Sequence, residues 1–295
     1  MEAAGSWQGI TVESKTDNRF DYCDFLNMGN YSRTDLGGIQ LTGAKAGITH
    51  CKFTNGLGTG LRTSSGSSYS ELSAFSNNVF EGYENEAPAV LNSSQSLSML
   101  EKFDMTTDFT RNAKQYIEIR PNMTKDVTLS QSTVPYYFNN SGNAVGTINN
   151  TLTISEGVTI YIANGIDFNN GYGANNGRLM INGTASKKVR FTRLPGTSGY
   201  WYRVDFTGLK GSVINHCIFE YGGGGFMTGT GILAFGSSTD VTLNNVEINN
   251  ADKYGVYMTS NYKLTHSNVT FSNNRLGNVF DRSTNPNGTV RNHFP

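Results

Sequence analysis

The chain has 295 residues and carries 23 Lys plus Arg against 23 Asp plus Glu, so its formal net charge at pH 7 is zero. This balance argues against nucleic acid as a partner, because no basic excess is available to neutralise phosphates. Only 37% of the residues are hydrophobic and 16% are charged, which suits the narrow core of a repeat protein. The sequence has no apolar run long enough to predict a transmembrane segment.

A short pattern recurs in the first part of the chain, residues 5–100. An apolar residue is followed three positions later by a small residue, and two positions after that by another apolar residue. The pattern occurs at Phe20/Cys23/Phe25, Ile48/Cys51/Phe53 and Phe75/Asn78/Phe80. Its last two members lie two apart, so their side chains point to one face of a strand. Steps of 28 and 27 residues predict the coils of a solenoid.

The middle of the chain, residues 101–195, is less regular. Residues 101–120 predict a short helix or an irregular loop, and the sequence assigns no role to residues 100–130. Apolar alternation then returns around Leu152, Ile160 and Leu179, which predicts further strands.

Residues 196–295 repeat the first segment. The pattern returns at Ile214/Cys217/Phe219, Leu243/Val246/Ile248 and Phe271/Asn274/Leu276, with a competing last frame at Leu264/Ser267/Val269. Gly199 and Trp201 match Gly5 and Trp7 at the same offset of 194 residues as Cys217 and Cys23. We therefore predict an internal duplication within one domain that spans residues 1–295.

Asparagine marks the expected corners, because it tolerates left-handed backbone angles. Asn27, Asn55, Asn250 or Asn278 stands two residues after the pattern. Short strands at this period predict an all-β, right-handed parallel β-helix. A β-propeller, the alternative, needs a period of about 40 to 50 residues.

The three cysteines, Cys23, Cys51 and Cys217, fill the small position of the pattern. We interpret them as small buried residues, with a disulfide between Cys23 and Cys51 as the alternative. Their spacing matches no metal-binding pattern, and the sequence predicts no metal site and no cofactor.

Several strings are typical of one group of proteins. They are LTISEGVTI from Leu152, NGTASKKVRFT from Asn182, Gly199 with Trp201, and INHCIFEYGG from Ile214. In these strings the chain resembles secreted right-handed parallel β-helix proteins, pectate-lyase-like solenoids of the Bacteroidetes surface-lipoprotein type. The resemblance covers most of residues 150–260 and, more weakly, residues 5–90. It implies export to the periplasm or cell surface after removal of a signal segment, but no particular activity.

Three functions are compatible with such a solenoid. The first is non-catalytic binding of a polysaccharide, since aromatic rings stack on sugars and polar neighbours orient them. The predicted binding residues are Tyr200, Trp201, Tyr202, Arg203, Asp205 and Tyr221, with Tyr257 and Tyr262 in the same part of the chain. In the structural alternative, Trp201 packs at a corner as Trp7 would.

The second function is a polysaccharide lyase or glycoside hydrolase, which needs paired carboxylates or acidic Ca²⁺ ligands. Arg203 and Asp205 are expected on one outward strand face, with Glu220 about one strand further round; the alternative is a surface ion pair. His50 and His216 are interpreted as solvent-facing strand residues. The sequence assigns no catalytic residue and leaves enzymatic activity open. The third function is a structural or adhesive spacer. The oligomeric state is also left open.

Overall fold

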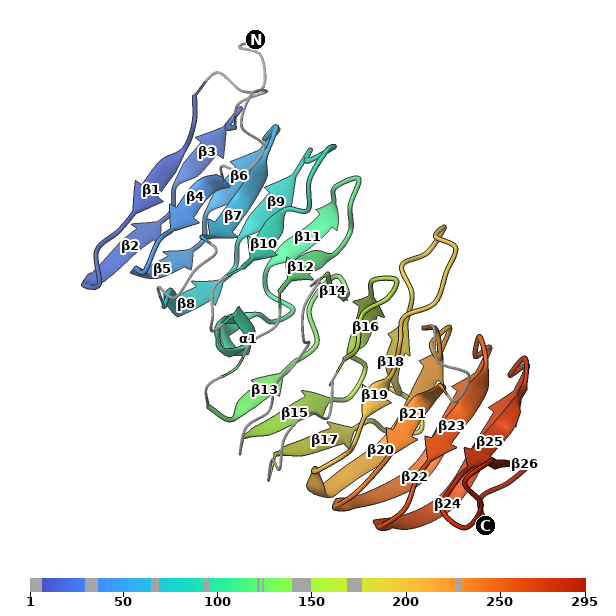
Figure 1. Ribbon diagram of the computed structural model, residues 1–295. Helices are drawn as coiled ribbons and strands as arrows, with labels where there is room; N and C mark the ends of the chain where they lie inside the picture. The colour runs from blue at the N-terminus through green and yellow to red at the C-terminus, as the bar shows by residue number, and fades with distance from the viewer. Residues whose placement is uncertain are drawn as a thin grey trace. The chain divides into compact units, whose positions relative to one another are not determined.

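The computed structural model describes residues 7–29, 37–64, 69–92, 96–120, 123, 125–139, 150–168, 177–225 and 230–295. The chain divides into two compact units. Unit 1 comprises Met1–Asn122 and Ser130–Tyr137, and unit 2 comprises Met123–Leu129 and Phe138–Pro295. Within each unit the strands stack in parallel, coil upon coil (Figure 1). This arrangement confirms the predicted all-β solenoid and excludes a propeller.

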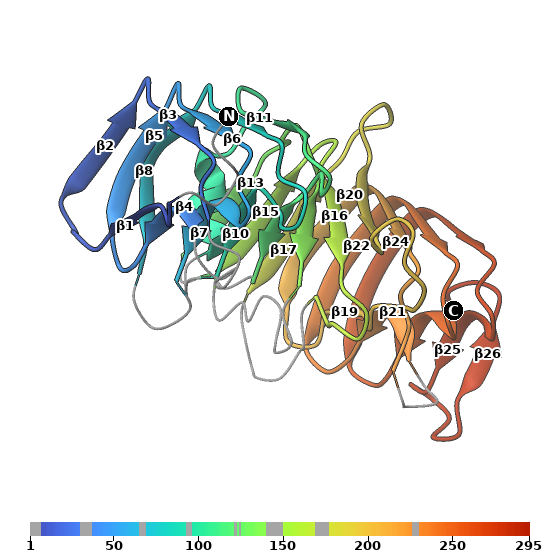
Figure 2. The same cartoon turned by 90° about the horizontal axis from the view of Figure 1, so that it is seen from above.

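Unit 1 has three stacks of parallel strands. The first contains β1 (Ile10–Val12), β4 (Gly37–Leu41), β7 (Thr59–Thr63), β10 (Ala89–Leu91) and β12 (Ile117–Ile119). The second contains β2 (Asp17–Asp21), β5 (Lys45–Thr49) and β8 (Glu71–Ser76), which lie side by side in Figure 2. The third contains β3 (Asp24–Leu26), β6 (Lys52–Thr54), β9 (Val79–Glu81) and β11 (Asp108–Arg111). The short helix α1 (Ser96–Met99), followed by the 3₁₀ turn η1 (Leu100–Lys102), packs against β8.

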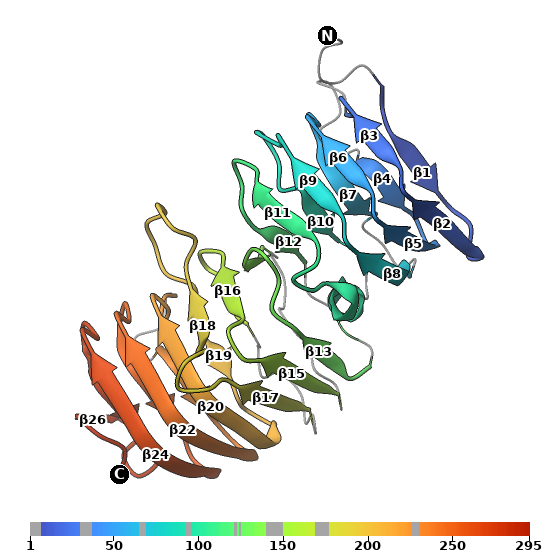
Figure 3. The same ribbon diagram turned by 180° about the vertical axis from the view of Figure 1, so that it is seen from behind.

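Unit 2 follows the same plan with longer strands. Its main stack contains β13 (Val127–Leu129), β15 (Thr151–Ser155), β17 (Arg178–Asn182), β20 (Lys210–Glu220), β22 (Thr239–Asn249) and β24 (Tyr262–Ser272), as Figure 3 shows from behind. β16 (Thr159–Ile162) pairs with β18 (Val189–Thr192), and β18 pairs with the second half of β20. The remaining stack contains β19 (Val204–Asp205), β21 (Gly231–Phe235), β23 (Tyr254–Met258), β25 (Gly277–Asp281) and the antiparallel β26 (Thr289–Arg291). β14 (Tyr136–Phe138) spans the division between the units.

The register of unit 1 confirms the predicted coil length. Phe20, Ile48 and Phe75 form one column, and Phe25, Phe53 and Phe80 form another. The Phe53 ring lies 4.7 Å from that of Phe25 and 4.3 Å from that of Phe80, measured between centroids. Phe53 and Phe80 are fully buried, so stacked rings fill the interior of this unit.

Buried asparagine closes the bend between two columns. Asn78 is fully buried; its Oδ1 accepts the N–H of Cys51 at 2.9 Å and its Nδ2 donates to the oxygen of Ile48 at 2.9 Å. These backbone groups belong to the end of β5 and the bend after it in the preceding coil, and the amide of Asn78 provides their hydrogen-bond partner. The small position of the pattern therefore holds either a small apolar side chain or an amide that bonds the coil before it.

The last coil of unit 2 differs from both predicted frames. Leu243 pairs with His266, and Ile248 pairs with Phe271, so the chain advances 23 residues instead of 28. The predicted frames starting at Phe271 and Leu264 are therefore wrong. The described residues place no further coil on β24, and its side chains are largely exposed. Because the pattern reflects burial, it fades in this strand.

The predicted asparagine corners are confirmed at three positions. Asn27, Asn55 and Asn250 have φ of 54°, 56° and 54°. Asn278 is not such a corner; Asn273, with φ of 55°, takes this place because the coil is shorter. The predicted duplication stays a prediction. One resemblance between the two parts is that Trp7 and Trp201 each donate Nε1–H to the carbonyl oxygen 19 residues later, that of Leu26 or Glu220. Gly5 lies outside the described residues.

Candidate functional site

The candidate site belongs to unit 2 and lies on the segment that leads from β18 to β20. Gly199 begins its bend with a φ of +100°. A Cβ atom there would approach Asn164 Nδ2 to 2.8 Å, so the bend requires glycine. The main chain then runs beside an earlier coil, with Tyr202 N–H donating to the oxygen of Ile166 at 2.9 Å.

Trp201 is fully buried and does not form part of a binding surface. Its Nε1 donates to the oxygen of Glu220 at 2.9 Å, and its exposed fraction is 0%. A Cβ on Gly222 would come within 2.7 Å of the indole, so the glycine makes room for the ring. The predicted role of Trp201 in stacking on a ligand is therefore wrong, and the structural alternative holds.

Tyr200 and Tyr221 come together around a residue that the sequence analysis missed. The Arg193 guanidinium carbon lies 4.1 Å from the Tyr221 ring centroid and 5.9 Å from that of Tyr200. All three side chains are partly exposed. Arg193 Nη1 donates to the oxygen of Gly199 at 3.2 Å. We call Arg193, Tyr200 and Tyr221 the aromatic–arginine cluster; cations are attracted to ring faces at such distances.

A sequence signal for Arg193 exists. Tyr221 follows it by 28 residues, the length of one coil, so the two positions are neighbours in a stacked solenoid. Arg193 itself comes directly after a strand and outside the repeated pattern, which is why the pattern did not select it.

The other predicted tyrosines do not extend the cluster into one strip. Tyr202 is partly exposed and faces Gly165, whose added Cβ would lie 3.6 Å from the phenol oxygen. Tyr257 packs on Phe280, with 6.1 Å between ring centroids. Tyr262 begins β24 and hydrogen-bonds to Ser283.

Arg203 lies between two carboxylates. Its Nη2 is 3.1 Å from Asp205 Oδ2, and its Nε is 3.7 Å from Asp167 Oδ1. The second contact is an ion pair that is too long for a hydrogen bond. Asp205 is buried and its Oδ1 also accepts the N–H of Thr207 at 2.9 Å. The predicted ion pair between Arg203 and Asp205 is therefore confirmed, although Asp205 is buried and not on an exposed surface.

Asp167 has an unusual acidity. Burial raises its pKa to about 6; the guanidinium of Arg203 opposes this rise and the charge of Asp205 adds to it. Desolvation disfavours the charged form of a carboxyl, so Asp167 takes up a proton as the pH falls through about 6. Glu220 is not part of this group, since it forms an ion pair with Arg190 of β18.

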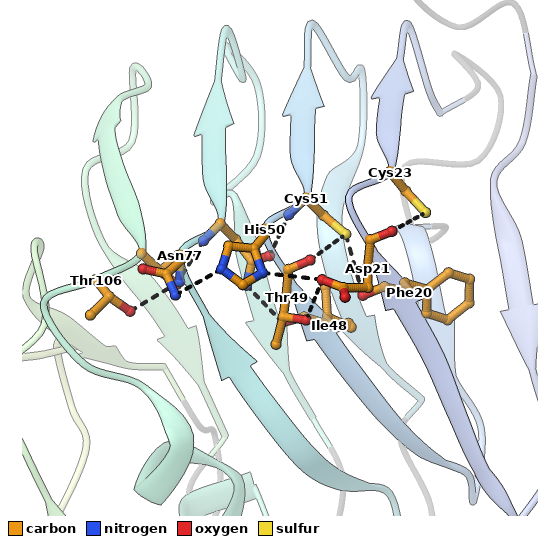
Figure 4. A network of polar contacts seen from close by, with 11 residues as sticks. Phe20, Asp21, Cys23, Ile48, Thr49, His50, Cys51, Asn77 and Thr106 are labelled. Carbon is orange, nitrogen blue, oxygen red and sulfur yellow. Dashed lines mark hydrogen bonds and ion pairs between the residues drawn. The ribbon is translucent and has the colours of Figure 1, made fainter.

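His50 lies at a corner directly after β5 and not on a strand as predicted, whereas His216 lies within β20, at a point where the backbone of that strand turns. Their φ angles are 53° and 46°. His50 lies between two side chains of neighbouring coils: its Nδ1 is 3.1 Å from Asp21 Oδ1 and its Nε2 is 3.3 Å from Asn77 Nδ2 (Figure 4). The imidazole also stacks on Tyr22 at 4.5 Å. These contacts use both ring nitrogens, so they explain His50 as part of a corner ladder.

The cysteines are all free thiols. Cys51 and Cys217 are buried, as predicted, and burial raises the pKa of both thiols. Cys23 is partly exposed, so the predicted burial is wrong for this cysteine. It lies beside Cys51 in the stack as predicted, with Lys52 N–H donating to the Cys23 oxygen at 2.9 Å. The alternative disulfide is not formed.

The described residues contain neither a metal-binding cluster nor a membrane-spanning helix. No group of three or more His, Cys, Asp or Glu side chains within them could hold a metal ion. Among these same residues, the structure contains no helix with the length and apolar character needed to cross a membrane.

The fold defines the chain as a parallel β-solenoid with an aromatic–arginine cluster on one of its bends. Beyond this class, comparison with protein-family models, with curated proteins and with solved structures finds no match.

Proposed function

We propose that this solenoid binds a polysaccharide without cleaving it, at the cell surface. The aromatic–arginine cluster supports the proposal more than any other observation. Tyrosine rings offer flat apolar faces for sugar stacking while their hydroxyl groups stay in water. The cluster belongs to a bend held by the backbone of two coils, which reduces the entropy lost on binding.

The charge of the cluster favours acidic sugars. A guanidinium has five N–H donors. Arg193 donates from Nη1 to the oxygen of Gly199. An arginine on an aromatic face is well suited to a carboxylate, which it binds through two parallel bonds. We therefore propose a uronic-acid polysaccharide as the ligand class.

The proposal is tested by isothermal titration with polygalacturonate, alginate and a neutral glucan. Arg193→Gln and Tyr221→Ala are each expected to weaken binding of an acidic polymer at least about tenfold. Arg275→Gln is the matched control, because Arg275 is more than half exposed in the last coil and pairs with Asp252. Binding that is absent in the parent protein, or unchanged in both cluster variants, would overturn the proposal.

A specific observation supports a second candidate, a glycoside hydrolase. Asp167, with its pKa raised to about 6, stands in one ion group with Asp205. A protonated carboxyl beside a second carboxyl is the combination that glycoside hydrolysis uses. If the parent protein releases reducing ends from a polysaccharide and Asp167→Asn does not, the function is hydrolysis and not binding alone. If the protein neither binds nor cleaves polysaccharide, the structural or adhesive spacer is the function that remains of the three.

Export belongs to the same proposal, in line with the sequence resemblance to secreted surface lipoproteins. The expected result is labelling of the chain by antibody on intact cells. Its recovery only after lysis would contradict a surface location.

A further inference from the structure

Cys23 and Cys51 occupy the same corner in two consecutive coils of unit 1. β2 pairs in register with β5 before this corner, and β3 pairs in register with β6 after it. The two cysteines lie between these paired strands, so each stands beside the other in the stack. The main chain links them as well, because Lys52 N–H donates to the Cys23 oxygen at 2.9 Å.

The spacing of adjacent coils suits a disulfide at this corner. Neighbouring strands lie about 4.7–4.9 Å apart, and disulfides join Cα atoms that are about 4.4–6.8 Å apart. Both cysteines lie between strands and outside the strand ladders. The bend can therefore bring the two Cβ atoms to the separation of about 3.8 Å that a disulfide prefers without breaking a ladder.

The Cys51 thiol faces the coil of Cys23. Its Sγ lies 3.2 Å from the oxygen of Thr49 in its own coil and 3.4 Å from the oxygen of Phe20 in the coil of Cys23 (Figure 4). Cys23 Sγ lies 3.5 Å from the oxygen of Asp21, in its own coil. Thiols are weak donors, so little stability is lost when the two sulfur atoms leave these contacts and bond to each other.

The two thiols differ in exposure, which sets the order in which they react. Cys23 is partly exposed and Cys51 is buried. Burial raises the pKa of the Cys51 thiol, and the charge of Cys23 adds to the rise. An oxidant from solution therefore meets Cys23 first, since reaction requires an accessible thiolate.

Cys217 has no cysteine beside it. It fills the same small position of the pattern in unit 2, but its partners in the adjacent coils are Val189 and Val246. Cys217 is also buried. The chain thus contains one stacked pair of cysteines and a third cysteine that serves as an internal control.

We propose that Cys23 and Cys51 form a disulfide by exchange with a small-molecule disulfide such as oxidised glutathione. The Cys23 thiol releases its proton to water, and the thiolate attacks one sulfur of the reagent, whose other sulfur leaves as a thiol. The Cys51 thiolate then attacks the Cys23 sulfur of this mixed disulfide, and the second half of the reagent leaves as a thiol. The chain loses two hydrogen atoms and two electrons, and the reagent takes them up.

The bond would join two coils covalently between residues that are 28 positions apart. Disulfides persist in oxidising compartments outside the cytosol, so the export proposed above would bring the pair to such a reagent. The inference does not depend on polysaccharide binding, because the aromatic–arginine cluster belongs to unit 2.

The test begins with the reduced native protein, which is incubated with oxidised glutathione. It is then unfolded in urea with N-ethylmaleimide, which blocks every remaining thiol, and is read by intact mass and peptide mapping. The number of blocked thiols per chain is expected to fall from three to one. The peptides of Cys23 and Cys51 are expected to be linked, and Cys217 is expected to carry the blocking group.

Two variants separate the steps of the exchange. Cys51→Ala is expected to stop at the mixed disulfide on Cys23, whereas Cys217→Ala is expected to form the same link as the parent protein. Circular dichroism shows whether each variant is folded, and the result with the parent protein does not depend on them. A parent protein that keeps three free thiols, that stops at the glutathione adduct, or that links Cys23 to a second chain would each overturn the proposal.

Discussion

Replacing Asn78 by alanine tests how one coil supports the coil before it. The amide of Asn78 satisfies the N–H of Cys51 and the carbonyl of Ile48, each at 2.9 Å, and the side chain is 0% exposed. Alanine would leave both backbone groups buried without a partner. Each such group costs about 1–3 kcal/mol, so we expect Asn78→Ala to lower the free energy of unfolding by about 4 kcal/mol.

A second asparagine provides the graded comparison. Asn274 plays the same part for Ala251 and Ile248, at 3.0 and 3.1 Å, but it is partly exposed in the last coil. Water can replace its amide there, so Asn274→Ala is expected to cost only about 1–2 kcal/mol. Asn249→Ala is the control, since Asn249 is partly exposed and accepts one hydrogen bond, from Ser272.

The assay is urea unfolding followed by far-ultraviolet circular dichroism. The free energy is extrapolated to water for the parent and each variant. The reasoning is refuted if Asn78→Ala costs less than about 1 kcal/mol, the net value of one ordinary hydrogen bond. It is also refuted if Asn274→Ala costs more than Asn78→Ala.

Three further predictions concern the core, the acidity of Asp167 and the thiols. Phe53→Ala removes a fully buried ring from the centre of its column. In urea unfolding it should lower the free energy of unfolding by about 3–5 kcal/mol. Met105→Ala is the control; Met105 is 55% exposed, so this change should alter the free energy of unfolding by less than about 0.5 kcal/mol. The raised pKa of Asp167, about 6, means that the folded state holds a proton that the unfolded state releases between about pH 4 and 6. The parent should therefore lose stability relative to Asp167→Asn as pH rises through this window, and a pH-independent difference in melting temperature would contradict the assignment. In the native protein Cys23 should react with a thiol reagent long before Cys51 and Cys217, which are buried, and equal rates would show that the small position of the coils is open to solvent.

The period of the core could be read from the sequence because burial enforces it. Phe25, Phe53 and Phe80 stack in register, and each must be apolar because the coils above and below cover it. The shorter last coil was missed for the same reason. His266 takes the place that follows Leu243 with no described coil beyond it, so no core constrains that residue.

The candidate site was only partly predictable. Tyr200 and Tyr221 were selected as aromatic residues, but the sequence cannot tell that Trp201, which stands between the partly exposed Tyr200 and Tyr202, turns inward. Its burial depends on Gly222, which leaves room for the indole. Arg193 and Asp167 lie on connecting segments, where backbone turns and not a repeat decide which side chains meet.

Zero-length carbodiimide cross-linking of the native protein, read by mass spectrometry, tests the stacked coils most directly. The account predicts isopeptide links between Lys52 and Glu81, Lys187 and Glu156, and Lys263 and Asp240, whose charged atoms lie 2.7, 3.0 and 3.3 Å apart. These partners are separated by 29, 31 and 23 residues, one coil each. Links that join lysines to carboxylates at unrelated separations, with these three absent, would contradict the solenoid.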